Sequence, residues 1–330
     1  MPAIEAHDLV KTYPKDIRAL DGISFSVQAG TVFGLLGPNG AGKSTTVKIL
    51  TTLSRPDSGT AKVAGHDILA APARVREAIG VVSQAGGLDR EATGRENLRL
   101  QGQVHGMGGR DLERRIDELL EQFGLADAGG RLVREYSGGM QRRLDVALGL
   151  VHSPRVLFLD EPTTGLDPEV RAEMWDEIER LTGRGLTVLL TTHYLEEADR
   201  LASRLAIVDR GRIVAEGSPD GLKRELEGDA IHVELANGAV EEDVRTTLSS
   251  VRSIRDLKVD GRLLHARASD GASAVPAVLA ALETGRIDVA SVSVARPSLD
   301  DVYLRYAGRT FSEAESASQG DNDERKEAVR

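Results

Sequence analysis

The stretch from Gly37 to Ser44, GPNGAGKS, has the composition of a loop that wraps a phosphate chain. Its glycines let the backbone curl so that N–H groups point inward and form an anion-binding nest. An apolar run that predicts a buried strand precedes it, and STTVKIL, which predicts a helix with its positive end toward the phosphates, follows it. Lys43 would reach the β- and γ-phosphates, and the Ser44 hydroxyl would ligate Mg²⁺. The alternative is a glycine turn without a ligand, which the order strand, loop, helix disfavours.

Two adjacent carboxylates follow a second predicted strand, in VLFLDEP at 156–162. The run from Val156 to Leu159 is continuously apolar, as is typical of a strand buried in a parallel sheet. Asp160 then emerges at the carboxyl end of that strand, where open α/β sheets bind their ligands. Asp160 could hold Mg²⁺ through water, and Glu161 could act as general base on an attacking water. Glu161 could instead be a helix N-terminal carboxylate, because a turn and a helix follow it.

A third apolar run, LTVLLTTH, predicts another buried strand that ends with His193. A single histidine at a strand end is more often structural than catalytic. This one comes one strand after the carboxylate pair, so we expect His193 to contact the γ-phosphate and to orient the attacking water.

A second phosphate site is predicted at the start of the helix within Tyr136–Val151. Ser137 is a suitable N-cap, and Gly138 and Gly139 leave the first N–H groups of the helix uncovered. The sequence has only one GxxxxGKS loop, so this second site has no nucleotide of its own. Two chains facing head to tail would remove the mismatch, because each would offer its Ser-Gly-Gly segment to the nucleotide of the other.

These motifs, in this order over residues 4 to about 222, resemble those of ABC-transporter ATP-binding subunits. The resemblance implies an α/β fold of the P-loop NTPase cassette type, with a parallel core sheet, an antiparallel edge subdomain and a helical insert. It also implies hydrolysis of ATP, with GTP as a possible substitute, in the presence of Mg²⁺. The implied partners are a separately encoded integral membrane permease and a second copy of this chain, with ATP at the interface.

The same resemblance assigns roles to three further residues. Tyr13 would stack on the adenine, Gln84 would complete the Mg²⁺ shell and sense the membrane partner, and Asp167 would lie at the dimer contact. The alternatives are a half-buried strand-end aromatic for Tyr13, a plain loop amide for Gln84 and a helix-start carboxylate for Asp167. The complete predicted set is Tyr13, Gly37, Pro38, Asn39, Gly40, Ala41, Gly42, Lys43, Ser44, Thr45, Gln84, Ser137, Gly138, Gly139 and Asp167 for the nucleotide, Ser44, Gln84 and Asp160 for the metal, and Glu161 and His193 for catalysis.

Changes in pattern along the chain predict two domains and a tail. The cassette would occupy residues 1–226, with strands over 4–34 that turn at Asp21-Gly22 and a helical insert at about 91–150. Residues 229–308 read β-α-β-β-α-β, which predicts a small α+β domain of ferredoxin-like arrangement. Residues 309–330 are rich in Ser, Glu and Asp, so we expect a disordered acidic tail.

The closing segment of the second domain, PSLDDVYLRYAG at 297–308, resembles the C-terminal end of drug-resistance ATP-binding subunits, notably those of daunorubicin/doxorubicin exporters. This resemblance favours a subunit that powers export of drugs or hydrophobic natural products. The alternatives are a soluble ABC ATPase that acts as a mechanical switch in translation or repair, and an importer subunit.

Composition agrees with a soluble cytoplasmic enzyme, and the resemblance implies a peripheral location on the cytoplasmic face of the cell membrane. No apolar run approaches 18 residues and no secretion leader is visible. The absence of cysteine excludes disulfides and thiol chemistry. A formal net charge of −10 argues against nucleic acid as a partner, because nonspecific binding needs basic patches that neutralise phosphates.

Overall fold

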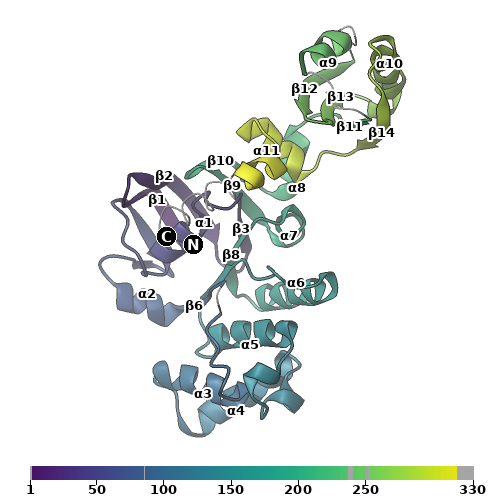
Figure 1. Ribbon diagram of the computed structural model, residues 1–330. Coiled ribbons are helices and arrows are strands. Elements are labelled where there is room, and N and C mark those ends of the chain that lie inside the picture. Colours follow the sequence, from purple (N-terminus) through teal and green to yellow (C-terminus); the bar gives the residue numbers. More distant parts are fainter. Residues whose placement is uncertain (1, 85, 237–240, 250, 252, 318–330) are drawn as a thin grey trace. The chain divides into compact units, whose positions relative to one another are not determined.

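The computed structural model describes residues 2–84, 86–236, 241–249, 251 and 253–317. The chain forms two compact units, of which the first ends at Ser218 and the second spans Pro219–Ala317 (Figure 1). The predicted division at 226–229 therefore lies a few residues late, because the helix α8 (Pro219–Glu225) belongs to the second unit. Among the described residues, no helix is both long and apolar enough to cross a bilayer.

A six-stranded sheet in the order β10-β9-β3-β8-β7-β6 forms the centre of the first unit. The strands from β9 to β6 pair in parallel, and β10 pairs antiparallel with β9 at one edge. Their bounds are β3 Val32–Leu36, β6 Ile79–Val82, β7 Val156–Asp160, β8 Thr187–Thr192, β9 Arg204–Asp209 and β10 Arg212–Gly217. The predicted strands at 156–160 and 187–192 are buried and adjacent, which brings their carboxyl ends together.

A second sheet, antiparallel and in the order β2-β1-β4-β5, forms the predicted edge subdomain. Its strands are β1 Pro2–Tyr13, β2 Ile17–Gln28, β4 Ser58–Val63 and β5 His66–Asp67. The prediction of a turn at Asp21-Gly22 is wrong. Gly22 has φ +83° and lies within β2, where the register shifts between the pairs Leu9–Ile23 and Val10–Asp21. Glycine here permits a β-bulge in a long strand rather than a reversal of the chain.

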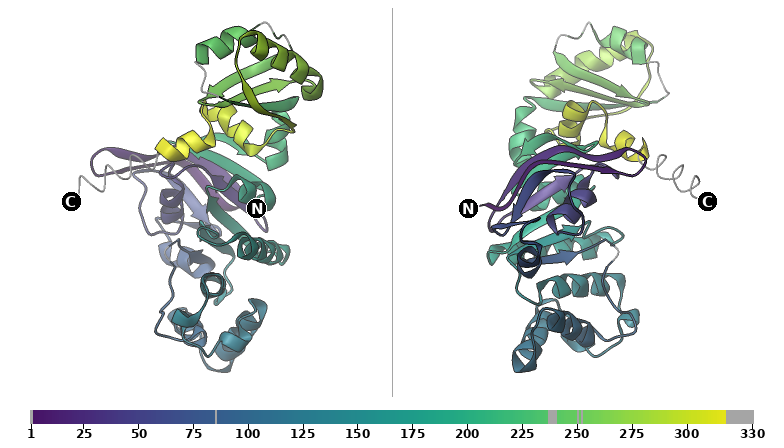
Figure 2. Two further views of the ribbon diagram at one scale, coloured as in Figure 1. Left: turned by 45° about the vertical axis from the view of Figure 1, so that its right-hand side comes forward. Right: turned by 90° about the vertical axis from the view of Figure 1, so that its left-hand side faces the viewer.

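Helices fill the space around these sheets. Apolar residues of α1 (Lys43–Leu50) share one hydrophobic core with both sheets. The predicted helical insert consists of α3 (Gly94–Val104), α4 (Gly109–Gln122) and α5 (Gly138–Leu150), which lie together at one end of the unit (Figures 1 and 2). The remaining helical segments of this unit are α2 Pro72–Ala78, η1 Ala126–Ala128, η2 Val133–Glu135, α6 Pro168–Gly183 and α7 Leu195–Leu201.

The second unit has the predicted ferredoxin-like order. Its antiparallel sheet runs β12-β13-β11-β14, and its strands are β11 Asp229–Leu235, β12 Ile254–Asp260, β13 Leu263–Ala268 and β14 Val289–Ala295. The helices α9 (Glu241–Leu248) and α10 (Gly271–Thr284) cover one face of this sheet and share its core. A further helix, α11 (Leu299–Ala307), begins with a capping box between Ser298 and Asp301.

The predicted start of the disordered tail, at residue 309, is too early. Residues 311–317 are helical, Phe311 is 4% exposed, and its ring lies 4.9 Å from that of Tyr303 in an edge-to-face contact. This one aromatic side chain, within an otherwise polar segment, provides the apolar anchor that the composition of the segment as a whole conceals. Residues 318–330 of the predicted tail lie outside the described residues.

Candidate nucleotide-binding and hydrolysis site

The loop between β3 and α1 has the geometry that the glycines predicted. Gly40 and Gly42 have φ of +76° and +112°, in the region that side chains disfavour. A Cβ on Gly37 would lie 2.3 Å from the carbonyl oxygen of Val208, so only glycine fits at that position. The Lys43 side chain lies over the loop and donates from Nζ to the carbonyl oxygens of Gly37 (2.7 Å) and Pro38 (3.0 Å).

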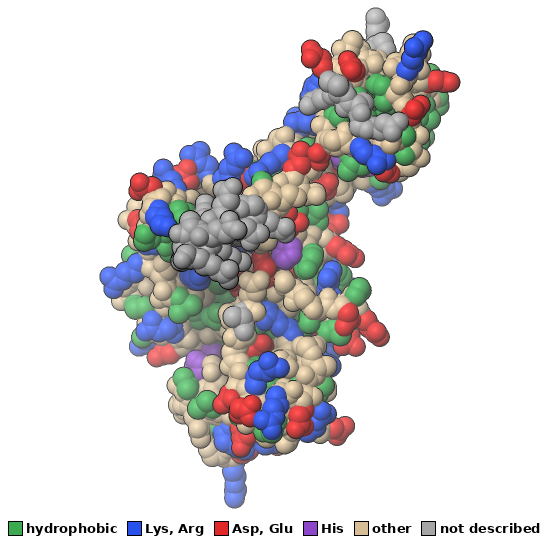
Figure 3. All heavy atoms as spheres, in the orientation of Figure 1, with side chains coloured by type: hydrophobic (Ala, Val, Ile, Leu, Met, Phe, Trp, Pro, Cys, Tyr) green, Lys and Arg blue, Asp and Glu red, His purple; other side chains and the backbone are tan. Residues whose placement is uncertain are grey.

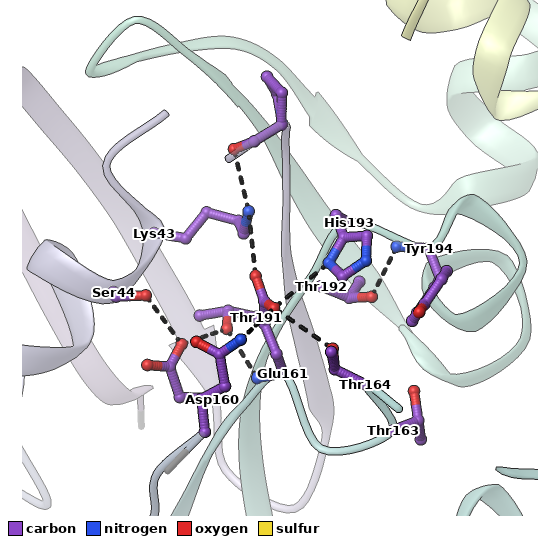
Figure 4. A network of polar contacts seen from close by, with 12 residues as sticks. Lys43, Ser44, Asp160, Glu161, Thr163, Thr164, Thr191, Thr192, His193 and Tyr194 are labelled. Atoms are coloured by element: carbon purple, nitrogen blue, oxygen red, sulfur yellow. Dashed lines mark hydrogen bonds and ion pairs between the residues drawn. The ribbon is translucent and has the colours of Figure 1, made fainter. Parts of the chain in front are cut away.

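Oxygen atoms suited to a magnesium ion meet at the carboxyl end of the sheet (Figure 4). Ser44 Oγ donates to Asp160 Oδ1 at 3.2 Å, and Thr191 Oγ1 donates to the same oxygen at 2.6 Å. Carboxylate and hydroxyl oxygens are the ligands that Mg²⁺ prefers. The described residues therefore fit the metal that the sequence predicted, with Ser44 and Asp160 in contact across two elements.

The backbone of Glu161 is held in an unusual conformation. Its φ is +50°, a left-handed value that costs a non-glycine residue about 1–3 kcal/mol. The Glu161 N–H donates to the Thr191 carbonyl and to Thr191 Oγ1, both at 3.1 Å, and its own carbonyl accepts from the Arg142 guanidinium at 3.2 Å. These contacts from two neighbouring elements stabilise the strained residue and orient its side chain.

Polar side chains surround the Glu161 carboxylate, which is buried. Lys43 Nζ lies 3.6 Å from Oε1, and His193 Nδ1 lies 3.3 Å from Oε2 (Figure 4). Gln84 Nε2 and Thr164 Oγ1 donate to Oε2, each at 3.3 Å. Burial is the largest influence and acts to raise the pKa of Glu161, but His193 and the Lys43 charge outweigh it, so the pKa lies below its ordinary value. Glu161 is therefore ionised at neutral pH, as a general base requires.

Four predicted nucleotide residues lie at the start of helices. Ser137 caps α5 by accepting from the Met140 N–H at 3.2 Å, and Gly138 beside it is exposed. Gly139 is buried, and a Cβ there would lie 2.6 Å from Val170 Cγ1, so this glycine also permits the helices α5 and α6 to approach. Asp167 caps α6 by accepting from the Val170 N–H at 2.9 Å, which is the helix-start role that the sequence left open.

Tyr13 lies half-buried at the end of β1, where Lys11 Nζ is 5.8 Å from the centre of its ring. Gln84 is exposed and contacts Glu161, as described above, so its predicted metal role remains a prediction, like the adenine role of Tyr13.

Arg142 and Thr191 are parts of this site that sequence reasoning missed. The Arg142 guanidinium, buried at 9% exposure, donates to four carbonyl oxygens, those of Ser83, Asp160, Glu161 and Pro162. It thereby joins the helix that follows Ser137 to the two segments that carry Gln84 and the carboxylates. Arg142 sits on the inward face of a predicted helix, and a charge at such a position was the signal available in the sequence.

A second buried contact lies behind the site. Glu197 is fully buried, and its Oε1 accepts from Thr163 Oγ1 at 2.7 Å and from Trp175 Nε1 at 3.0 Å. Trp175 is itself a core residue, at 5% exposure. Glu197 therefore connects the segment after Glu161 to both α6 and α7.

Comparison with known proteins agrees with this geometry. The ABC transporter family profile matches residues 20–164. A daunorubicin resistance ATP-binding protein, DrrA3, from Streptomyces coeruleorubidus is 50% identical over 293 residues, which are 89% of this chain and 92% of that protein. The chain belongs to the ABC-transporter ATP-binding subunits. A profile for the C-terminal domain of DrrA1-3-like ATP-binding proteins matches residues 217–307.

More distant relatives and solved structures extend the family. A Nod factor export ATP-binding protein from Burkholderia lata is 41% identical over 90% of this chain and 95% of its own length. The structure of an ATP-binding subunit of an ABC transporter matches with a TM-score of 0.61 and 30% identity, covering 68% of this chain and 92% of that one. This ABC ATPase therefore binds and hydrolyses ATP, and it is the energy-supplying subunit of an exporter.

Proposed function

We propose that this ABC ATPase powers the export of drugs or hydrophobic natural products through a separate membrane permease. The observation that carries the proposal is the second unit. It matches the DrrA1-3-like C-terminal domain over residues 217–307, while relatives named for daunorubicin and doxorubicin resistance align with 89–95% of this chain. A switch protein of translation or repair, or an importer, would account for the cassette but not for this domain.

ATP would be hydrolysed between the loop at 37–44 and the carboxylates of Asp160 and Glu161. Mg²⁺ bound near Ser44 and Asp160 would neutralise developing charge on the phosphates, and Gln84 would complete its shell. Ionised Glu161 would accept a proton from the attacking water. His193, which already lies beside Glu161, would orient that water and contact the γ-phosphate. Lys43 would exchange its bonds to the loop carbonyls for bonds to the phosphates.

The working form would be a homodimer with ATP at the interface. Support comes from the exposed Ser137 and Gly138 at the start of α5, because the N-terminal end of a helix and its dipole favour an anion. A cassette named MJ0796, solved as a dimer in a post-hydrolysis state with ADP and Pi, matches with a TM-score of 0.60 and 25% identity over 65% of this chain and 98% of that one. The exposed Asp167 would contact the partner chain.

The dimer would act at the cytoplasmic face of the cell membrane, bound to the permease rather than to lipid or nucleic acid. Lys and Arg side chains alternate with Asp and Glu on the face in Figure 3. With a net charge of −10, the chain offers no general attraction to phosphate backbones.

The proposal is tested by drug resistance in a sensitive host. Co-expression with a candidate six-span membrane permease should lower intracellular anthracycline, and Glu161→Gln should abolish the effect at equal expression. The permease alone and this chain alone are the controls. Unchanged drug accumulation with both wild-type subunits present would contradict export of such compounds.

A further inference from the structure

We propose that His232, His265 and Asp301 form a binding site for a divalent transition metal, Zn²⁺ by preference, in the second unit. His232 lies on β11, His265 on β13 and Asp301 on α11. Each offers one ligand atom, and these atoms lie within 4.8 Å of one another. All three residues belong to one compact unit, and they are distinct from the residues of the nucleotide site.

The fold places the two imidazoles side by side. His232 and His265 are register partners on adjacent antiparallel strands, so their side chains leave the sheet on the same face. Ile231 and Val233, which flank His232, belong to the core under α9 and α10. Because side chains alternate between faces, the histidines lie on the face away from those helices. Their Nδ1 atoms are 3.0 Å apart.

The third ligand is oriented by its own helix. In the capping box of α11, Asp301 Oδ2 accepts from the Ser298 N–H at 2.8 Å and from Ser298 Oγ at 2.7 Å. That leaves Oδ1 directed at His232, whose Nε2 is 4.0 Å away. A carboxylate fixed through one oxygen with the other available is a common arrangement around bound metals.

The spacing is close to that of a zinc site. Ligand atoms 2.0–2.1 Å from a tetrahedral Zn²⁺ lie about 3.3 Å apart. The Nδ1 atoms of His232 and His265 are 3.0 Å apart, and the ligand atoms that the three residues offer all lie within 4.8 Å of one another. Rotation about the broad χ2 torsions of His and Asp would close the difference without moving the backbone.

A plain histidine–histidine hydrogen bond leaves a polar atom unexplained. His265 Nε2 is buried and has no hydrogen-bond partner among the described residues.

A cavity gives solvent access to the proposed site, and the basic side chains around it make contacts with other groups. A cavity of about 140 Å³ adjoins His265 and Asp301, which leaves room for water ligands. Three basic residues line it. Arg305 Nη1 contacts Asp256 Oδ1 at 3.0 Å, Lys258 donates to the Gly308 carbonyl at 3.1 Å, and Arg267 Nη2 donates to the carbonyls of Glu227 and Gly228 at 2.8 and 3.1 Å. A bound ion would fasten α11, within the segment 297–308, to the sheet.

Zinc titration of the full chain tests the site. The protein is freed of metal, kept without nucleotide in excess Mg²⁺ to block the nucleotide site, and titrated with Zn²⁺ against a chromophoric chelator. One Zn²⁺ per chain is expected, with affinity lowered at least about tenfold in His232→Gln and in His265→Gln. His7→Gln removes an exposed imidazole from the other unit and is the matched control.

Two further measurements guard against a folding artefact. Co²⁺ should give a visible absorption band in the wild type that is lost in His232→Gln, and Zn²⁺ should raise the unfolding temperature of the wild type and of His7→Gln but not of His232→Gln. Circular dichroism identifies any variant that fails to fold, and His232→Gln alters a side chain that is 30% exposed. The proposal is overturned if the wild type binds no more Zn²⁺ than the double variant His232→Gln/His265→Gln.

Discussion

At the scale of single residues, the surroundings of Glu161 suit the role of general base that we propose for it. Its carboxylate is buried, yet Lys43 and His193 keep it ionised. Glu161→Gln preserves the shape and most contacts but cannot accept a proton. We expect ATP binding to persist while turnover falls by roughly 10²-fold or more. The measurement is phosphate release beside nucleotide binding, and ATP-bound dimers should accumulate in size-exclusion chromatography.

Glu196→Gln is the control for this prediction, because Glu196 is an exposed carboxylate beside the site. Normal hydrolysis by Glu161→Gln would remove Glu161 from the role of base. The pH profile gives a second check. Since the pKa of Glu161 is lowered, acid should inhibit kcat only below the usual titration range of a glutamate, and a loss beginning near pH 6 would point to another group.

The surroundings of His152 lead to a prediction about the pH dependence of the free energy of unfolding. Its Nε2 donates to the Ile79 carbonyl at 2.9 Å, its ring stacks on His105 at 3.6 Å, and burial is the main reason that its pKa falls to about 4. The unfolded chain binds this proton near pH 6.5 and the folded chain only near 4, so stability is lost as the pH falls between these values. From pH 7 to pH 5 the loss should be about 2 kcal/mol.

Urea unfolding followed through the fluorescence of Trp175, the sole tryptophan, measures this change in the first unit. His152→Gln should lose most of the difference between pH 7 and pH 5, whereas the exposed-site variant His7→Gln should keep it. Equal pH dependence in His152→Gln and wild type would show that other groups control the acid sensitivity.

Sequence predicted some residues of the site better than others. The loop at 37–44 and the pair Asp160-Glu161 were predictable because their chemistry needs those types at those spacings. Arg142 and Thr191 were not, because their partners are mainly backbone carbonyls and a carboxylate that lie far away in the chain. Only the packing of α5 and β8 against β7 reveals them.

At the scale of elements, the start of α5 carries the prediction of a shared site. Ser137 and Gly138 are exposed at a helix N-terminus, and we propose that they serve the nucleotide of the opposite chain. Ser137→Arg should therefore spare ATP binding at its own loop but block dimer closure, because the bulky cation occupies the space of the γ-phosphate. Nucleotide binding, dimerisation and ATPase activity are measured separately.

A mixture of two variants tests more specifically whether the site is shared between chains. Chains with Lys43→Ala and chains with Ser137→Arg place both defects on one composite site in each heterodimer and leave the other intact. Partial activity should return from two inactive parents if one intact site can turn over. Mixing wild type with each parent is the control. A Ser137→Arg chain that fails to bind ATP alone would place Ser137 at its own nucleotide.

The predicted helices and strands match the observed ones where the hydrophobic periodicity and the length of a segment indicated the same type of element, as in β3, β7, β8 and the second unit. The turn predicted at Asp21-Gly22 was wrong because a residue with positive φ can form a β-bulge as well as a turn. Only the pairing with the neighbouring strand distinguishes the bulge from the turn. The disorder predicted for the segment after 309 was wrong for residues 311–317, because the composition is polar overall while Phe311 and Ala314 are buried.

At the scale of the whole molecule, the two units have separate cores. The core of the second unit draws on β11, β12, β13, β14, α9 and α10, and α8 packs on α11 within the same unit. A protein formed from residues 219–317 should therefore fold alone and unfold cooperatively on heating. Residues 1–218 should bind ATP like the full chain, because every described contact of the site lies within them.

A second fragment of the first unit, which ends ten residues later, provides the control. Residues 1–228 retain α8 without α11, so Leu222 and Leu226, which are 2% and 6% exposed in the full chain, would face solvent. This longer fragment should aggregate more than 1–218 at equal concentration, measured by light scattering, although both keep the nucleotide site. If 1–228 were the better-behaved fragment, α8 would belong with the cassette, as the sequence boundary at 226 suggested. Loss of ATP binding in both fragments would show that the second unit supports the site itself.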